Sequence, residues 1–348
     1  MTTAPHPLLA TAHALAADLL APHAARVDQA GVPASHLDAI RRSGLLGVSA
    51  PKEYGGAGAP DAVAREIQEV IAGACCSTWF VQTQHHSPVR LLAQSALPVR
   101  ERLLGPLATG ELLAGIAFAH VRAFPRVPVR VTAERDGWRF DGTVPWFTGW
   151  GLNDVMLLAG VSEADEVVFA FTEAREQPGL RASEPMRLAA LTAARTVSLE
   201  LDGLWLPDDA VVLRTPQEKF ALVDRPRNTN ASPAVFGVAY AALRVLEDAG
   251  ESETAGALRG RLDEVREQVY ALADHPVPYE RVAERLALKT RSYDLMRAAT
   301  TAAVVAGGGR AMGLDNTAQR LFREGMFLLV QGQTTEVRRA HLDALVQL

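Results

Sequence analysis

Cysteine is nearly absent from this sequence of 348 residues: there are two, and they are neighbours at positions 75 and 76. Adjacent cysteines cannot close a useful disulfide loop, so the composition excludes a disulfide scaffold. We interpret Cys75 and Cys76 as two small buried residues rather than as a redox or metal centre.

The sequence also lacks a positive excess of charge and any long apolar run. Lys and Arg number 35 against 40 Asp and Glu, a formal net charge of −5, which predicts no nucleic-acid partner. No uncharged apolar stretch approaches the ~18–20 residues of a membrane span, and residues 1–7 lack a basic leader. We therefore expect a soluble, cytoplasmic protein without a membrane partner.

Common catalytic signatures are missing as well. The sequence contains no Gly-x-x-x-x-Gly-Lys-Ser/Thr, Gly-x-Ser-x-Gly, His-Glu-x-x-His or Cys-x-x-Cys. Gly307-Gly308-Gly309 does not follow an expected strand, so a dinucleotide fingerprint is excluded. His85 and His86 are adjacent and point in different directions, which makes a shared metal ion unfavourable; we expect no metal.

Hydrophobic periodicity divides the chain into three domains. Residues 1–112 have helical spacing, with a Pro- and Gly-rich loop at 50–58. Residues 113–213 alternate with a period of two and predict a β-domain, a barrel or sandwich. Residues 214–348 return to helical spacing with several apolar seams, which predicts a four-helix bundle. The fold class is therefore α+β.

Within the β-domain, the dipeptide Asp136-Gly137 separates two alternating runs and predicts a hairpin. Further strands are expected at 155–161, 167–171 and 196–201, where short apolar runs end at Gly, Asp or Pro.

Three segments are candidates for a binding site. His120 ends an apolar run where the β-domain begins, and it is either a titratable group beside a ligand or a hydrogen-bonded core histidine. Residues 144–150 place two Trp, a Phe and a hydroxyl at a strand end, which suits either a flat ring or simple core packing. Residues 331–336 are polar, with Thr334 or Thr335 as the N-cap of the last helix, where an anion or a polar cofactor edge is favoured.

Collinear motifs are spread over the whole chain. They are Gly44-Leu45-Leu46 with the loop at 50–58, Gly142 to Thr148, Leu201 to Pro207, Gly308-Gly309, Arg320 to Glu324 and Thr334 to Glu336. Together they resemble the acyl-CoA dehydrogenase superfamily of flavoproteins, whose layout is also helical domain, β-domain and helical bundle.

The resemblance implies FAD as cofactor. Trp146, Phe147 and Thr148 would contact the isoalloxazine ring, and Gly308 and Gly309 would admit the adenosine half. Thr334 and Glu336 would face the cofactor from the last loop, and His120 would lie beside it. The implied partners are an acyl-CoA or similar small molecule, an electron-transfer flavoprotein or flavin reductase, and further copies of the chain in a homodimer or homotetramer.

The sequence departs from the family at the catalytic base. Gly332 occupies the position of the usual Glu, and Asn230 the position that other relatives use, so neither abstracts a proton. His120 remains as a candidate base. We expect an FAD-dependent oxidoreductase acting on an acyl thioester or related small molecule. A flavin-dependent monooxygenase of the same fold and a non-catalytic ligand-binding homologue are the alternatives.

Overall fold

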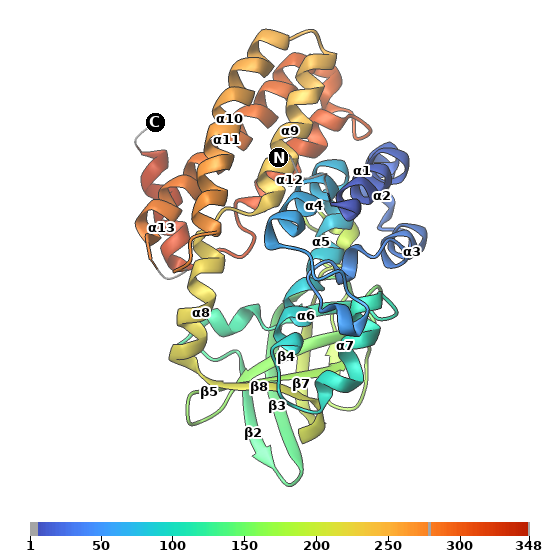
Figure 1. The fold of residues 1–348 in the computed structure, drawn as a ribbon, viewed down its shortest axis with the longest axis vertical. Coiled ribbons are helices and arrows are strands. Elements are labelled where there is room, and N and C mark those ends of the chain that lie inside the picture. The colour runs from blue at the N-terminus through green and yellow to red at the C-terminus, as the bar shows by residue number, and fades with distance from the viewer. Residues whose placement is uncertain (1–5, 278–279, 347–348) are drawn as a thin grey trace.

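The computed structural model describes residues 6–277 and 280–346. They form helices, then a sheet, then a helical bundle, with the bundle above and the sheet below in Figure 1. This is the α+β architecture that the sequence predicted.

The first helices have apolar faces because their apolar residues recur at helical spacing; Ile67 and Ile71, one turn apart, are both buried. Residues 50–58 form a loop with a 3-10 turn at Lys52–Tyr54. Gly56 is required there, because a Cβ atom would lie 2.2 Å from the carbonyl oxygen of Ala50. The helices are α1 (Pro7–Leu15), α2 (Ala21–Ala30), α3 (Ala34–Arg42), α4 (Asp61–Ala74), α5 (Cys76–Thr83), α6 (His86–Ala93) and α7 (Val99–Thr109).

The middle of the chain forms one eight-stranded sheet in the order β6-β7-β3-β2-β4-β5-β8, with β1 parallel to β4. The strands are β1 (Ala114–Ala117), β2 (Val129–Glu134), β3 (Gly137–Phe147), β4 (Val155–Val161), β5 (Glu166–Glu173), β6 (Leu180–Ala182), β7 (Val197–Pro207) and β8 (Val211–Pro216).

The predicted hairpin is confirmed. Strands β2 and β3 are antiparallel, with Val131 opposite Phe140, and Asp136 adopts a left-handed φ of 60° in the turn. The expected strands at 155–161, 167–171 and 196–201 correspond to β4, β5 and β7. The pattern did not identify β6 or β8, and the last strand continues to Pro216, beyond the boundary placed at 213.

Four helices, α9 (Pro233–Asp248), α10 (Ser252–Ala273), α11 (Val282–Gly307) and α12 (Thr317–Leu328), pack together as the bundle. Helix α9 begins where the Ser232 side chain accepts a hydrogen bond from the Ala234 amide, with Pro233 in the first turn. Helix α8 (Gln217–Thr229) connects the sheet to the bundle, and α13 (Thr335–Leu345) follows α12.

The first helices and the bundle share one hydrophobic core, which extends from α1 through α5 to α9, α10, α11 and α12. Helices α4 and α9 approach closely because each has a glycine at the crossing. A Cβ atom at Gly237 would lie 2.2 Å from the carbonyl oxygen of Glu69, and one at Gly73 would lie 2.6 Å from that of Gly237. Separate apolar clusters fill the two faces of the sheet, with α6 and α7 on one of them.

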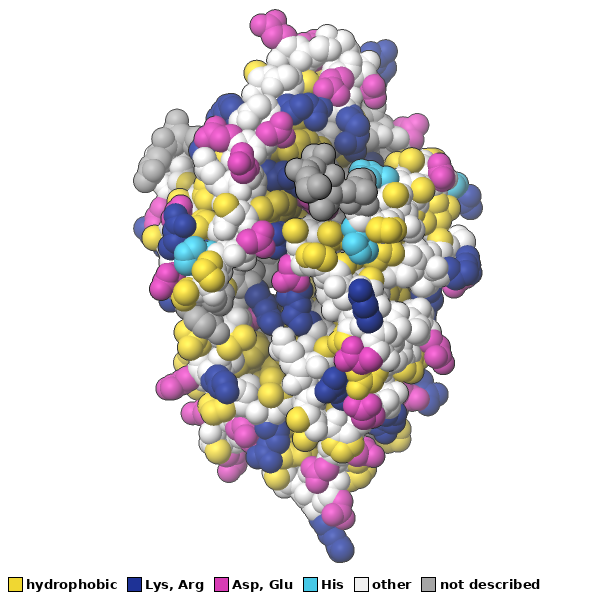
Figure 2. All heavy atoms as spheres, viewed as in Figure 1, with side chains coloured by type: hydrophobic (Ala, Val, Ile, Leu, Met, Phe, Trp, Pro, Cys, Tyr) yellow, Lys and Arg dark blue, Asp and Glu magenta, His cyan; other side chains and the backbone are white. Residues whose placement is uncertain are grey.

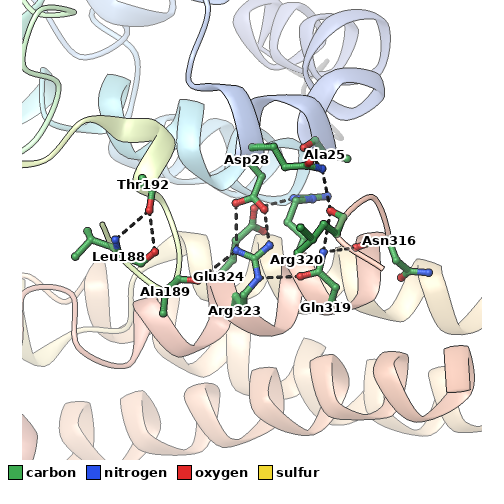
Figure 3. A network of polar contacts seen from close by, with 12 residues as sticks. Ala25, Asp28, Leu188, Ala189, Thr192, Asn316, Gln319, Arg320, Arg323 and Glu324 are labelled. Carbon is green, nitrogen blue, oxygen red and sulfur yellow. Dashed lines mark hydrogen bonds and ion pairs between the residues drawn. The ribbon is translucent and has the colours of Figure 1, made fainter. Parts of the chain in front are cut away.

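A polar network joins α2, α12 and the loop before β7 (Figure 3). Arg323 on α12 pairs with Asp28 on α2, donates to the carbonyl oxygen of Ala189 at 3.3 Å and donates to Gln319 at 2.8 Å. One turn earlier, Arg320 forms a buried ion pair with Glu324 at 2.7 Å. The network fixes the loop that leads into β7.

The substitution Gly237→Ala should lower the free energy of unfolding by about 1–3 kcal/mol, because the new methyl group overpacks the contact between α4 and α9. Urea denaturation measures the change. The control is Gly256→Ala on α10, where an added Cβ meets no atom within 4 Å and helix propensity favours alanine. An equal loss of stability in both variants would contradict the close approach.

Candidate functional site

The tripeptide Trp146, Phe147 and Thr148 lies at the end of β3, and its side chains alternate in direction. Trp146 is 56% exposed. Phe147 is fully buried in the sheet core and packs edge-to-face on Trp150, so its side chain does not belong to an open wall. The hydroxyl of Thr148 lies 3.2 Å from that of Thr196 on the neighbouring segment.

His120 lies in the 3-10 helix Ala119–Ala123 and is buried. Its Nε2 donates to the carbonyl oxygen of Ala159 at 2.9 Å, while Nδ1 is buried without a partner among the described residues. Burial lowers the pKa of His120 to about 4, so the ring is neutral at pH 7. The bond from Nε2 to the sheet fixes the ring, and Nδ1 is the nitrogen without a partner among the described residues. The role of His120 as a base stays a prediction.

Gly332 lies in the loop between α12 and α13 with a left-handed φ of 63°. A Cβ atom there would lie 4.0 Å from Oδ1 of Asn228 on α8. Position 332, which we predict to correspond to the family's usual carboxylate, therefore faces α8.

Beside it, α8 carries a buried carboxylate that the sequence analysis missed. Asp224 accepts hydrogen bonds from Arg122 at 2.6 and 2.9 Å and from the amide of Asn228 at 2.6 Å. Its two oxygens are thus committed to a guanidinium and an amide, so Asp224 holds α8 against the 3-10 helix of His120. The one local signal was the spacing of Asp224 and Asn228 by four residues on a helix.

Asn230, the second position considered for a base, ends α8 and is tied to α11. Its Oδ1 accepts from Arg285 at 2.7 Å, and its carbonyl oxygen accepts from Lys289 at 3.0 Å. These contacts give the residue a structural role at the junction between α8 and α9.

The last loop has the expected helix cap. Thr334, one of the two residues that the sequence offers as the cap, accepts through Oγ1 from the amide of Val337 at 3.3 Å, and α13 begins at the other, Thr335. Glu336 pairs with Arg225 on α8 at 2.6 Å, so its carboxylate links α13 to α8.

Gly308 and Gly309 follow the end of α11, and an added Cβ at either would meet nothing within 4 Å. Helix α12 has 12 residues. At 1.5 Å per residue it separates these glycines from the loop of Gly332 by roughly 18 Å. The candidate residues therefore form two groups at opposite ends of α12, in addition to the end of β3.

The cysteines are inert in this structure. Both thiols are buried, and burial raises the pKa of each above its ordinary value. Within residues 6–277 and 280–346, no three His, Cys, Asp or Glu side chains are grouped to hold a metal ion. Among the described helices, none combines the length and apolarity needed to cross a membrane.

Two buried histidines should make the protein sensitive to acid. Burial lowers the pKa of His85 to about 3 and that of His120 to about 4, below the ordinary 6.5. As the pH falls below the ordinary value, the unfolded chain binds protons at these rings and the folded chain does not. Between the ordinary pKa of 6.5 and the folded-state values of about 4 for His120 and about 3 for His85, the free energy of unfolding should therefore decrease by about 1.4 kcal/mol per histidine per pH unit.

Urea denaturation of His120→Gln between neutral and acidic pH tests this expectation. The free energy of unfolding of the variant should depend less steeply on pH, because its unfolded chain takes up one proton fewer. The exposed His13→Gln is the matched control. If the pH dependence of the free energy of unfolding is the same in His120→Gln as in the wild type, the result would contradict the burial of a neutral His120 ring.

The helical domain, sheet, bundle and connecting loops define the acyl-CoA dehydrogenase fold, so the predicted resemblance is confirmed. Residues 4–111 match the family model described as acyl-CoA dehydrogenase, N-terminal domain.

Relatives that are named as acyl-CoA dehydrogenases are about a quarter identical to this chain over the aligned residues. The acyl-CoA dehydrogenase fadE25 of Mycobacterium leprae, named as probable, is 27% identical over 68% of this chain and 63% of its own length. Its namesake in Mycobacterium bovis is 25% identical over 94% of this chain and 91% of the relative.

Solved structures agree over almost the whole chain. Butyryl-CoA dehydrogenase from Megasphaera elsdenii has a TM-score of 0.83 and 17% identity, covering 99% of this chain and 100% of that one. Dibenzothiophene monooxygenase from Paenibacillus sp. A11-2 has a TM-score of 0.80 and 18% identity, and the match covers 98% of this chain and 97% of that one. Glutaryl-CoA dehydrogenase from Mycobacterium smegmatis, in complex with FADH2, has a TM-score of 0.78 and 17% identity, and the match covers 98% of this chain and 94% of that one.

Proposed function

We propose that this chain is an FAD-dependent oxidoreductase that acts on an acyl thioester or a related small molecule. The observation that supports it is the agreement in fold with butyryl-CoA dehydrogenase over 99% of this chain, together with the match of residues 4–111. Reduced FAD is named in the structure of the glutaryl-CoA dehydrogenase neighbour.

The residues at the end of β3 fit a flat ring. The exposed side chain of Trp146 offers an apolar face, and two residues further along the chain the hydroxyl of Thr148 pairs with that of Thr196. Backbone at Gly308 and Gly309 is free of side-chain cover and is suited to a polar ligand half. In this proposal Trp146 and Thr148 hold the ring and Thr334 contributes from the loop, whereas Phe147 supports the strand from within.

When bound, FAD accepts a hydride from the substrate. The chain must bind and orient the thioester and exclude water, and a dehydrogenase must also remove an α-proton. Position 332 offers no carboxylate for that step, and the carboxylate of Asp224 is already hydrogen-bonded to Arg122 and Asn228. An electron-transfer flavoprotein or a flavin reductase is the redox partner in this proposal.

The missing base favours a second candidate, a flavin-dependent monooxygenase, because that reaction requires no α-proton carboxylate. The similarity in fold to dibenzothiophene monooxygenase supports it. A ligand-binding homologue without turnover is the third reading.

The proposal includes a homo-oligomer, a homodimer or homotetramer, in the cytoplasm. Phe322 and Met326 lie one turn apart on α12 and are exposed, and Val330, two residues beyond the end of that helix, is exposed as well. Exposed apolar side chains of this kind are suited to packing against another copy of the chain.

The purified protein should be yellow with bound flavin, and anaerobic addition of acyl-CoA thioesters should bleach it without added reductant. Visible absorbance measures both. If the thioesters leave the flavin oxidised but NADH with a flavin reductase reduces it, the result would favour the monooxygenase. A colourless protein that takes up no FAD would exclude both enzymes and favour the ligand-binding homologue without turnover.

The substitution Gly332→Glu should raise acyl-CoA oxidation by about 10²–10⁴-fold, because a positioned base contributes that much to proton transfer. The left-handed backbone at 332 should lower stability by roughly 1–2 kcal/mol. Gly332→Gln is the control, since it has the same strain and no base. Equal rates in the two folded, flavin-loaded variants would contradict the assignment of position 332.

A further inference from the structure

A cavity of about 370 Å³ lies between α2 and α3, which Figure 1 draws at the edge of the molecule. Two histidines, an arginine and a serine line it: His23 and Arg26 on α2, and Ser35 and His36 in the first turn of α3. Figure 2 shows Lys, Arg and His side chains at this edge. Small-molecule sites measure about 300–1,000 Å³, so the cavity can hold a small ligand.

The lining of this cavity is basic. Among the described residues that line it there is no Asp or Glu. Asp28, two residues after Arg26 on α2, pairs with Arg323 on α12 and is therefore occupied. The cavity thus has a positive charge that its own lining does not neutralise, which favours an anion.

His36 is almost completely buried, at 2% exposure, and the fold uses one of its ring nitrogens. Nδ1 lies 3.4 Å from Oγ1 of Thr78 on α5, and that hydroxyl donates to Sγ of Cys75 at 3.3 Å. Because the hydroxyl has a single proton, Nδ1 of His36 is the donor. Nε2 has no partner among the described residues and is the nitrogen left for a ligand.

His23 is arranged in the same way. Its Nδ1 donates to the carbonyl oxygen of Leu19 at 2.7 Å, which leaves Nε2 with a lone pair in the neutral ring. The two imidazoles pack edge-to-face with their centroids 5.8 Å apart. Burial, together with the neighbouring His23, lowers the pKa of His36, which keeps that ring neutral at pH 7.

Helix α3 adds backbone donors to the cavity. It begins at Ala34 after Pro33, and no side chain caps its first turn. Amide groups in a first turn have no acceptor within the helix and lie at the positive end of the helix dipole. The amide and the hydroxyl of Ser35 have no partner among the described residues, so both are available to a ligand in the cavity.

We propose that this cavity binds a small phosphate monoester with an apolar body. The guanidinium of Arg26 binds two phosphate oxygens in parallel, and Ser35 donates to a third. Leu19, Val27 and Val32 supply the apolar part of the lining. The site is separate from the proposed flavin site, because neither the end of β3 nor the loops of Gly308 and Gly332 line the cavity.

The two imidazoles favour phosphate over carboxylate. The second pKa of a phosphate monoester is about 6, close to the ordinary 6.5 of an imidazole. A monoester that keeps its second proton donates it to an imidazole Nε2, and one that has lost it accepts from a protonated ring. A carboxylate carries no proton at neutral pH, so the lone pairs of neutral rings would repel it.

Calorimetric titration of the purified protein at pH 7 tests the proposal. Phenyl phosphate is the probe, and benzoate offers the same apolar body with a carboxylate. Saturating FAD and free CoA are present, so that sites for their phosphates are filled. Phenyl phosphate should bind more tightly than benzoate by about tenfold or more, the effect of one further charge-assisted hydrogen bond.

Matched variants place the probe in the cavity. Arg26→Gln should weaken the binding of phenyl phosphate by roughly tenfold. His23→Phe keeps a ring against His36 but removes both nitrogens, and it should also weaken the binding. Arg42→Gln removes the same charge from the exposed last residue of α3 and should leave the affinity within about twofold, as surface charges contribute little. Circular dichroism confirms that the variants are folded.

Three results would overturn the proposal. The first is a wild-type protein that binds no phenyl phosphate, or binds benzoate equally well. The second is phenyl phosphate that binds only when FAD and CoA are left out, which would assign it to the sites of those molecules. The third is equal weakening by Arg26→Gln and Arg42→Gln, which would assign the binding to the general charge of the surface. None of these results depends on flavin bleaching, so the proposed function is tested separately.

Discussion

The guanidinium of Arg323 connects three parts of the chain that are far apart in sequence. It pairs with Asp28 on α2, lies on α12 and donates to the carbonyl oxygen of Ala189 in the loop before β7. Removing one partner from a largely buried ion pair leaves the other charge uncompensated, which costs about 3–5 kcal/mol. Because that loop leads to Thr196, whose hydroxyl lies against that of Thr148, the end of β3 depends on a contact made by α2 and α12.

Local features of the fold were predictable, and features set by distant partners were not. The dipeptide Asp136-Gly137 predicts its hairpin because the turn is encoded within adjacent residues, and Thr334 predicts its cap for the same reason. Strand β6 is three residues long and pairs only with β7, so its own sequence carries too little pattern. The register of β3 decides that Phe147 points into the core while Trp146 is exposed, and the motif alone does not determine register.

The candidate site shows the same division. The motifs identified the segments, but the ion pairs that assign roles within them join residues about a hundred positions apart, such as Arg122 with Asp224 and Arg225 with Glu336. In the short helix of residues 119–123, His120 bonds to the sheet and Arg122 bonds to α8. One turn of chain thus attaches the sheet to α8, the helix that the loop of Gly332 faces.

The single core shared by the first helices and the bundle affects how the protein is made. Helix α4 leaves the ribosome long before α9, its partner at the crossing of Gly73 and Gly237, has been translated. The apolar face of α4 therefore stays exposed while the whole sheet is synthesised. Exposed apolar surfaces of this kind bind chaperones or aggregate. Neither helical part is a self-sufficient folding unit, so a truncation between them would leave two incomplete cores.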